Sequence, residues 1–140
     1  MKYFIASSWS NMKQVQLLTE NLTALGHEVF SYVKDKRNFV PGEELIEEDK
    51  FKNKDYKTDP EIKEIYEKDI EGLSEADVFI MVLPAGNSSH ITAGIAFALN
   101  KKTILIGSPE KTETHYLIFN QQYNSIEDCV ASIKEEKSAR

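Results

Sequence analysis

The chain has 140 residues, of which 41% are hydrophobic and 29% are charged, and its formal net charge at pH 7 is −6. This size and composition are typical of one folded domain with a normal core, and no apolar run approaches the roughly 20 residues that span a bilayer. The negative charge argues against general nucleic acid binding, which depends on cationic contacts with phosphates. The first apolar stretch is too short for a signal peptide, so a cytoplasmic protein without a membrane partner is expected.

Cys129 is the only cysteine. Without a partner it excludes an internal disulfide and any multi-cysteine metal site. Its position within an apolar periodic pattern near the end of the chain predicts a buried core thiol. No metal and no cofactor are expected.

The first elements in chain order form a βαβ pattern. Residues 2–6 are apolar and predict a short strand, and the polar loop that follows contains Ser7, Ser8 and the only tryptophan, Trp9. Apolar residues then recur at helical spacing up to Gly26, a helix stop, and residues 28–32 predict a second strand. In a parallel sheet, the loop after the first strand opens at the carboxyl edge.

Residues 33–58 lack a periodic pattern. Acidic residues between 43 and 49 are followed by lysines between 50 and 57, and such charge runs are usually solvated loops or exposed helical turns. Three aromatic residues, Phe39, Phe51 and Tyr56, would let the segment fold over a site as a lid. Loops of this length in compact domains are often functional or mobile.

The next segment begins with a strong helix start, Asp59-Pro60-Glu61, and the helix is expected to run to about Leu73. Asp69 lies on its apolar stripe. A carboxylate that faces inward must be paired, hydrogen-bonded or bound to a ligand. Two explanations remain open: Asp69 caps a neighbouring loop, or it contacts a ligand. The stripe comprises Ile62, Ile65, Tyr66, Ile70 and Leu73.

The following stretch is the centre of the predicted fold. Residues 78–83 form a continuous apolar run, which predicts a strand buried on both faces of a parallel sheet. Pro84 ends the strand, and a turn leads into a short, buried helix over residues 91–99. The amino end of that helix would favour an anion beside Ser88 and Ser89. An equally supported explanation is that these serines only cap the helix.

The last third of the chain predicts another strand, at 103–106, and a closing helix. Residues 117–119 are either a short fifth strand or an apolar turn, Ser125 and Asp128 resemble a capping box, and residues 135–140 are expected to fray. The element order predicts a single domain over 1–140, a three-layer doubly wound α/β sandwich of the flavodoxin or Rossmann kind. Its parallel sheet would have four or five strands.

Three stretches together resemble the nucleoside 2-deoxyribosyltransferase-like family. They are Ala6–Asn11 followed by Leu25–Phe30, then Tyr66–Leu73 leading into Ala76-Asp77, and Leu83–His90 with Ala93–Ala96. The family includes transferases that exchange bases on deoxynucleosides and hydrolases that remove the base from nucleoside monophosphates. The likeness spans most of the chain except its lysine-rich middle.

The resemblance implies a pocket for a nucleoside or nucleotide. Asp69 would match the family aspartate that contacts the sugar and assists the reaction. Members of the family commonly form homodimers or higher homo-oligomers, and the same is expected here. The base and sugar pocket would be lined by Ser7, Ser8 and Trp9, and the sugar 5′ end or its phosphate would be held by the loop of Gly86, Asn87, Ser88, Ser89 and His90.

Thr92 departs from the family pattern. The family's catalytic glutamate, which attacks the anomeric carbon, stands two residues before the glycine of this helix, where this chain has Thr92. A threonine hydroxyl carries no charge and is a weak nucleophile unless a base such as His90 activates it. Loss of such a carboxylate removes on the order of several kcal/mol of transition-state stabilisation.

Two functions therefore remain open. In one, the protein is an N-glycosidase or deoxyribosyltransferase in which Asp69, with or without a glutamate from the middle segment, replaces the missing group. In the other, it is a catalytically impaired nucleotide-binding protein that serves as a sensor, a sequestering protein or a scaffold. A structural partner domain without a ligand is a weaker third hypothesis.

Overall fold

The computed structural model describes residues 1–31 and 51–139. The predicted lid falls largely on the other residues, so Phe39 and the acidic run lie outside the described residues. The elements in chain order are β1 (Lys2–Ser7), η1 (Trp9–Asn11), α1 (Met12–Ala24), β2 (Glu28–Phe30), α3 (Pro60–Glu75), β3 (Val78–Val82), α4 (Asn87–Ala98), β4 (Lys102–Ile106), η2 (Thr114–Ile118), β5 (Gln121–Tyr123) and α5 (Ile126–Ser138).

The strands form one parallel sheet in the order β2-β1-β3-β4-β5. In its register, Phe4 of β1 lies between Phe30 of β2 and Phe79 of β3. The chain thus builds outward from β1 to one side, returns to β3 beside it, and continues to the other side. This order confirms the doubly wound flavodoxin-like sandwich, with five strands.

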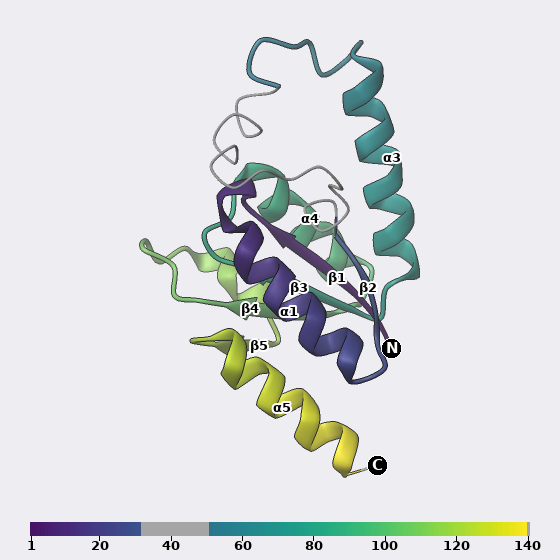
Figure 1. The fold of residues 1–140 in the computed structure, drawn as a ribbon. Helices are drawn as coiled ribbons and strands as arrows, with labels where there is room; N and C mark the ends of the chain where they lie inside the picture. The colour runs from purple at the N-terminus through teal and green to yellow at the C-terminus, as the bar shows by residue number, and fades with distance from the viewer. Residues whose placement is uncertain (32–50, 140) are drawn as a thin grey trace.

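Helices cover both faces of the sheet: α1 and α5 lie on one, α3 and α4 on the other (Figure 1). Side chains of successive strand residues point to opposite faces. Ile80 therefore packs in the core under α1 and α5, whereas Phe79 packs in the core under α3 and α4. Every residue of β3 is buried, which confirms it as the central strand.

The predicted helix caps at Asp59 and Ser125 are confirmed. A carboxylate oxygen of Asp59 accepts hydrogen bonds from the backbone N–H groups of Glu61 (2.9 Å) and Ile62 (3.1 Å). The Ser125 hydroxyl accepts from the N–H of Asp128 at 3.1 Å. Fraying from residue 135 is wrong as far as Ser138, because α5 stays helical to there. The Lys137 ammonium near its end donates to the Leu25 carbonyl, which attaches α5 to the end of α1.

The fifth strand lies later in the chain than the apolar residues suggested. Leu117 and Ile118 belong to η2, so the turn explanation of 117–119 holds, and the strand is Gln121–Tyr123. The sequence pattern did not predict this strand, because an edge strand with an exposed polar position contains no apolar run. The buried Thr103 hydroxyl donates to the Ile118 carbonyl at 2.7 Å, and this bond anchors the turn to β4. Cys129 is fully buried, as predicted.

Helix α3 is less buried than its apolar stripe predicted. Tyr66 is 62% exposed, so its assignment to the inward stripe is wrong. Leu73 is the one buried residue that this helix contributes to the core. The first turns of α3 stand away from the sheet in Figure 1. Near the end of the helix, Leu73 belongs to the same core cluster as Phe4 and Phe79. The middle of the helix is therefore placed to form the wall of a cavity.

Candidate ligand-binding site

A cavity of about 350 Å³ lies at the carboxyl edge of the sheet, where the loops after β1 and β3 diverge. Open α/β sheets hold their ligands at this point, because the strand order reverses there and adjacent loops separate. The end of β1 forms its floor, and α3 and the start of α4 form its walls. Its lining residues are Phe4, Ile5, Ala6, Ser7, Ser8, Trp9, Ser31, Phe51, Ile65, Asp69, Gly86, Asn87, Ser88, Ser89 and Thr92.

Asp69 lines this cavity from α3 and is half-buried. Its carboxylate makes no hydrogen bond or ion pair with any part of the chain that the structure describes, so no contact there supports the loop-capping explanation. Burial raises the pKa of this carboxyl from its ordinary 3.8 to about 6, since desolvation disfavours the charged form. A ligand that donates a hydrogen bond to Asp69 would relieve this cost.

The start of α4 faces the cavity with unused donors. The helix begins at Asn87, one turn earlier than predicted, and its N-cap, Gly86, makes no side-chain capping bond. The explanation of Ser88 and Ser89 as mere caps is therefore wrong. The first N–H groups of a helix lack an intrahelical acceptor. Ser89 is only 8% exposed, yet its hydroxyl finds no hydrogen-bond acceptor or donor within residues 1–31 and 51–139.

Ser7 has a different role from its neighbours. Its hydroxyl donates to the carbonyl of Val82 at 2.7 Å, and it accepts from the Asn11 amide at 3.0 Å. The Ser8 backbone N–H donates to the carbonyl of Pro84 at 3.1 Å. These bonds join the loop after β1 to the loop after β3 and hold the two sides of the cavity at a fixed separation. Trp9 lines the cavity beside them.

His90 does not line the cavity, although the resemblance implied a place for it there. Its Nδ1 lies 2.8 Å from the Gly86 carbonyl oxygen and its Nε2 lies 3.0 Å from the Tyr116 hydroxyl. Because a carbonyl only accepts, the contact with Gly86 requires a proton on Nδ1, and in that tautomer Nε2 accepts from the Tyr116 hydroxyl. His90 thus ties α4 to η2, and both ring nitrogens are occupied.

Thr92 lies in the cavity wall, one turn after the unused donors of α4. Its hydroxyl donates to the Ser88 carbonyl at 2.8 Å, so its proton is committed to the helix backbone. With His90 directed at Tyr116, no described base contacts the Thr92 hydroxyl. The only carboxylate among the described lining residues is that of Asp69.

Six lining residues were not assigned to the site from the sequence: Phe4, Ile5 and Ala6 of β1, together with Ser31, Phe51 and Ile65. Ile65 stands one helical turn before Asp69, so the period that placed Asp69 inward could have placed it as well. Ser31 directly follows β2 at the carboxyl edge of the sheet, a position that topology alone predicts to lie near the site. Phe51 was predicted as part of a lid, and it lines the cavity, whereas Tyr56 is 71% exposed.

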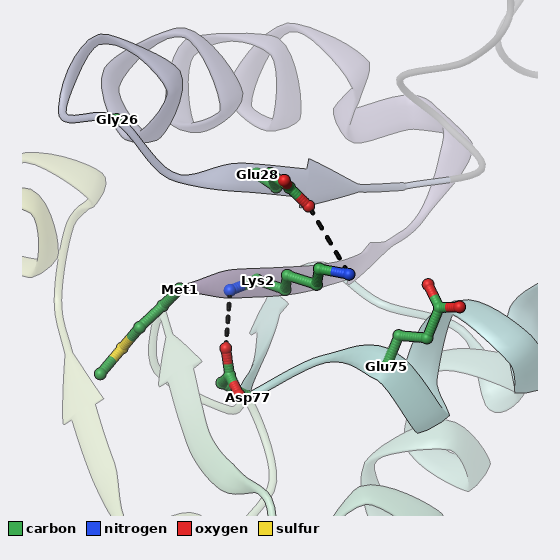
Figure 2. A pocket seen from close by; sticks show the side chains of 6 residues that line it. All are labelled: Met1, Lys2, Gly26, Glu28, Glu75 and Asp77. Carbon is green, nitrogen blue, oxygen red and sulfur yellow. Dashed lines mark hydrogen bonds and ion pairs between the residues drawn. The ribbon is translucent and has the colours of Figure 1, made fainter.

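A second hollow, of about 530 Å³, lies at the opposite, amino-terminal edge of the sheet (Figure 2). The Lys2 backbone N–H donates to the Asp77 carboxylate at 2.8 Å, and the Lys2 ammonium lies 3.8 Å from the Glu28 carboxylate. The Lys2, Glu28 and Asp77 side chains are exposed, the two carboxylates already have partners within the chain, and all three residues lie at the edge of the sheet opposite to Asp69. The volume of this hollow therefore does not make it the better candidate.

Across residues 1–31 and 51–139, no three His, Cys, Asp or Glu side chains gather into a possible metal site. Over the same ranges, no helix combines the length and apolar character needed to cross a bilayer.

The fold and the position of the cavity define a doubly wound α/β protein with a ligand site at its strand-order reversal. Neither a protein-family model nor a curated protein matches the sequence. Three solved structures do match the fold over more than nine-tenths of this chain. The CMP N-glycosidase BcmB of Clostridium botulinum is 18% identical, with a TM-score of 0.61, and the match covers 96% of this chain and 99% of that one.

The 2-deoxyribosyltransferase of Bacillus psychrosaccharolyticus is 16% identical, with a TM-score of 0.63 and coverage of 93% of this chain and 90% of that one. A conserved protein of Enterococcus faecalis V583 is 13% identical, with a TM-score of 0.59 and coverage of 97% and 98%. The chain therefore has the nucleoside 2-deoxyribosyltransferase-like fold, as its sequence resemblance predicted.

Proposed function

We propose that this protein binds a nucleoside or a nucleotide in the cavity between β1, α3 and α4. The observation that carries the proposal is that the lining of this cavity has two chemically different parts. One part is apolar and aromatic, with Trp9, Phe51 and Ile65. The other part is polar, and the hydrogen-bonding groups of Asp69 and Ser89 have no partner among residues 1–31 and 51–139.

A nucleoside has the same division, with a flat apolar-faced base and a hydroxyl-rich sugar. In the proposed complex the sugar lies against Asp69, whose carboxylate accepts hydrogen bonds from hydroxyl groups. The 5′ end of the sugar, with or without phosphate, lies at the start of α4, where Ser88, Ser89 and the free N–H groups donate. The base occupies the aromatic part of the cavity.

We further propose that catalysis at the N-glycosidic bond is impaired. Cleavage or transfer passes through an oxocarbenium-like centre that an adjacent carboxylate stabilises. Asp69 is the one described carboxylate in the cavity, and Thr92 supplies only a neutral hydroxyl that is already hydrogen-bonded. Binding without rapid turnover would fit a sensor, a sequestering protein or a scaffold.

A second candidate function is slow N-glycosidic cleavage or transfer, and one observation favours it. Asp69 is retained, half-buried and without a partner in the described part of the chain, as an acid that assists sugar chemistry would be. A solved N-glycosidase and a solved 2-deoxyribosyltransferase share the fold.

One experiment separates these functions. Purified protein is incubated with deoxynucleosides, ribonucleosides and their 5′-monophosphates, and thermal unfolding and free base are both measured. A rise in the melting temperature without released base supports the binding function, and released base supports the enzyme. If no compound raises the melting temperature and none is cleaved, the proposed function is wrong.

We also propose that the protein forms a homo-oligomer through the outer face of α4. This helix is apolar on nearly all sides, and the sequence predicted that it is buried. That prediction is wrong for its outer side, because Ile91 is 65% exposed and Phe97 is 49% exposed. Leu117 of the adjoining η2 is 90% exposed. Large apolar side chains that are exposed on adjoining elements commonly mark a protein interface. The cytoplasmic location expected from the sequence stays a prediction.

A further inference from the structure

Two aromatic side chains from distant parts of the chain meet at the cavity. Trp9 follows β1, whereas Phe51 precedes α3, and both line the cavity that contains Asp69. We propose that Phe51 is a base-recognition residue, whose ring packs against the flat face of a heteroaromatic base. This inference rests on the proposed function. It adds the residue that selects a base-bearing ligand over a bare sugar.

Contacts within the described chain hold Phe51 at the cavity. The backbone N–H of Lys54 donates to the Phe51 carbonyl at 3.1 Å and closes a turn. The Lys54 ammonium lies 5.8 Å from the centroid of the Phe51 ring. It also lies 3.6 Å from a carboxylate oxygen of Asp59 and 3.3 Å from one of Glu61.

These contacts connect the ring to α3. Asp59 caps the helix that carries Asp69, and the same Asp59 holds Lys54. The aromatic wall and the inward carboxylate are therefore positioned by one element. A base stacked on Phe51 would leave its attached sugar on the Asp69 side of the cavity. Stacking tolerates all bases, because each has a π face.

The chain offers a matched control for Phe51. Tyr56 lies in the same segment, and the Lys57 ammonium is again 5.8 Å from its ring centroid. Tyr56 is 71% exposed and does not line the cavity. Phe51→Leu and Tyr56→Leu therefore remove comparable aromatic rings with a lysine beside them, and only one of the two faces the cavity.

The experiment is a titration of the wild type and both variants by calorimetry. The ligands are 2′-deoxyadenosine and 2′-deoxycytidine and their 5′-monophosphates, with 2-deoxyribose and 2-deoxyribose 5-phosphate as base-free counterparts. Phe51→Leu is expected to weaken binding of base-bearing ligands by about 10-fold. It should leave base-free ligands and the melting temperature unchanged. Tyr56→Leu should change none of these values.

Two further variants and one signal extend the test. Phe51→Trp, made in a Trp9→Phe background, is expected to keep the affinity for base-bearing ligands. Lys54→Met is expected to lower that affinity by about 3-fold, because the Phe51 ring loses the cation that lies over it. In the Phe51 variants that keep Trp9, this sole tryptophan reports base binding by fluorescence quenching. Lys54→Met should leave base-free ligands unaffected.

The outcomes separate this inference from the proposed function. If the wild type binds base-bearing ligands and Phe51→Leu binds them equally well, the inference is overturned and the proposed function stands. An equal loss for base-bearing and base-free ligands overturns it too, since the variant then acts through general damage to the site. If the wild type binds none of the base-bearing ligands, the proposed function fails and this inference fails with it.

Discussion

At the scale of single residues, the polar groups that line the cavity are of two kinds: some form hydrogen bonds within the fold, and others face a ligand. The hydroxyl groups of Ser7 and Thr92 donate hydrogen bonds to backbone carbonyls. Asp69 and Ser89 have no hydrogen-bond partner in the described ranges. Moving a polar group out of water without giving it a partner costs free energy, so substitutions of Asp69 and Ser89 test whether a ligand supplies that partner.

Asp69→Asn is expected to stabilise the free protein at neutral pH and to weaken ligand binding. In the folded protein the pKa of Asp69 is about 6, above its ordinary value of 3.8. Between pH 3.8 and pH 6, Asp69 is therefore ionised in the unfolded chain but still protonated in the folded protein. Stability from this group is thus present at low pH and lost as the pH rises through 6. The variant cannot ionise and should melt roughly 3–6 °C above the wild type at neutral pH, with equal melting near pH 4.

The measurement is thermal unfolding from pH 4 to 8, with and without nucleoside. Glu71→Gln is the control, because Glu71 is exposed on the same helix. A constant melting difference between Asp69→Asn and the wild type across this pH range would contradict the assigned pKa. An unchanged ligand-induced shift in Asp69→Asn would remove this residue from the site.

Thr92→Glu is expected to create or increase release of free base. The side chain already lines the cavity, and a carboxylate there would stabilise the positive charge that develops on the sugar. The rate should rise by about 100-fold or more if the pocket is otherwise intact. Chromatography of reactions with deoxynucleosides and monophosphates measures it. Thr92→Gln has the same size without the charge, so equal rates for both variants would refute the electrostatic explanation.

At the scale of elements, the cavity depends on how closely α3 approaches the sheet. Gly72 makes this approach possible, since a Cβ at this position would stand 2.8 Å from the Phe30 ring. That ring stacks on Phe4, with ring centroids 5.1 Å apart, and Phe4 lies in the floor of the cavity. The contact between α3 and β2 therefore reaches the binding site through two aromatic rings.

Gly72→Ala is expected to destabilise the protein by about 1–2 kcal/mol, because overpacking outweighs the better helix propensity of alanine. Gly94→Ala is the matched comparison. Gly94 is also inside a helix, but a Cβ there meets nothing within 4 Å, so propensity alone should stabilise the protein by about 0.5–1 kcal/mol. Urea denaturation measures both. Stabilisation by Gly72→Ala would show that Phe30 moves aside at little cost.

At the scale of the whole molecule, exposed apolar side chains lie on α4 and the adjoining η2, namely Ile91, Phe97 and Leu117. Ile91→Glu with Leu117→Glu should convert the proposed oligomer to a monomer, since a buried unpaired charge is costly at an interface. Light scattering after size exclusion measures the mass. Leu17→Glu on α1 is the control, as Leu17 is 38% exposed in the opposite layer. A monomeric wild type would overturn the proposal.

The sequence alone determined the layers, the central strand and the inward direction of Asp69. These features follow from local periodicity: the buried run of β3, the helical stripe of α3 and the caps at Asp59 and Ser125 each depend on residues close in the chain. The sequence also placed the loop that contains Ser7, Ser8 and Trp9 and the turn at Gly86 at one edge of the sheet, because parallel strands end at the same edge.

Only the tertiary structure decided which polar groups are already hydrogen-bonded within the protein and which helix faces are covered. His90 is bound to Tyr116, 26 residues away, and Ser7 to Val82, 75 residues away. Tyr66 and Ile91 are exposed because nothing in the described chain packs over their sides of α3 and α4. Such pairings arise from contacts distant in sequence, and a local pattern carries no information about them.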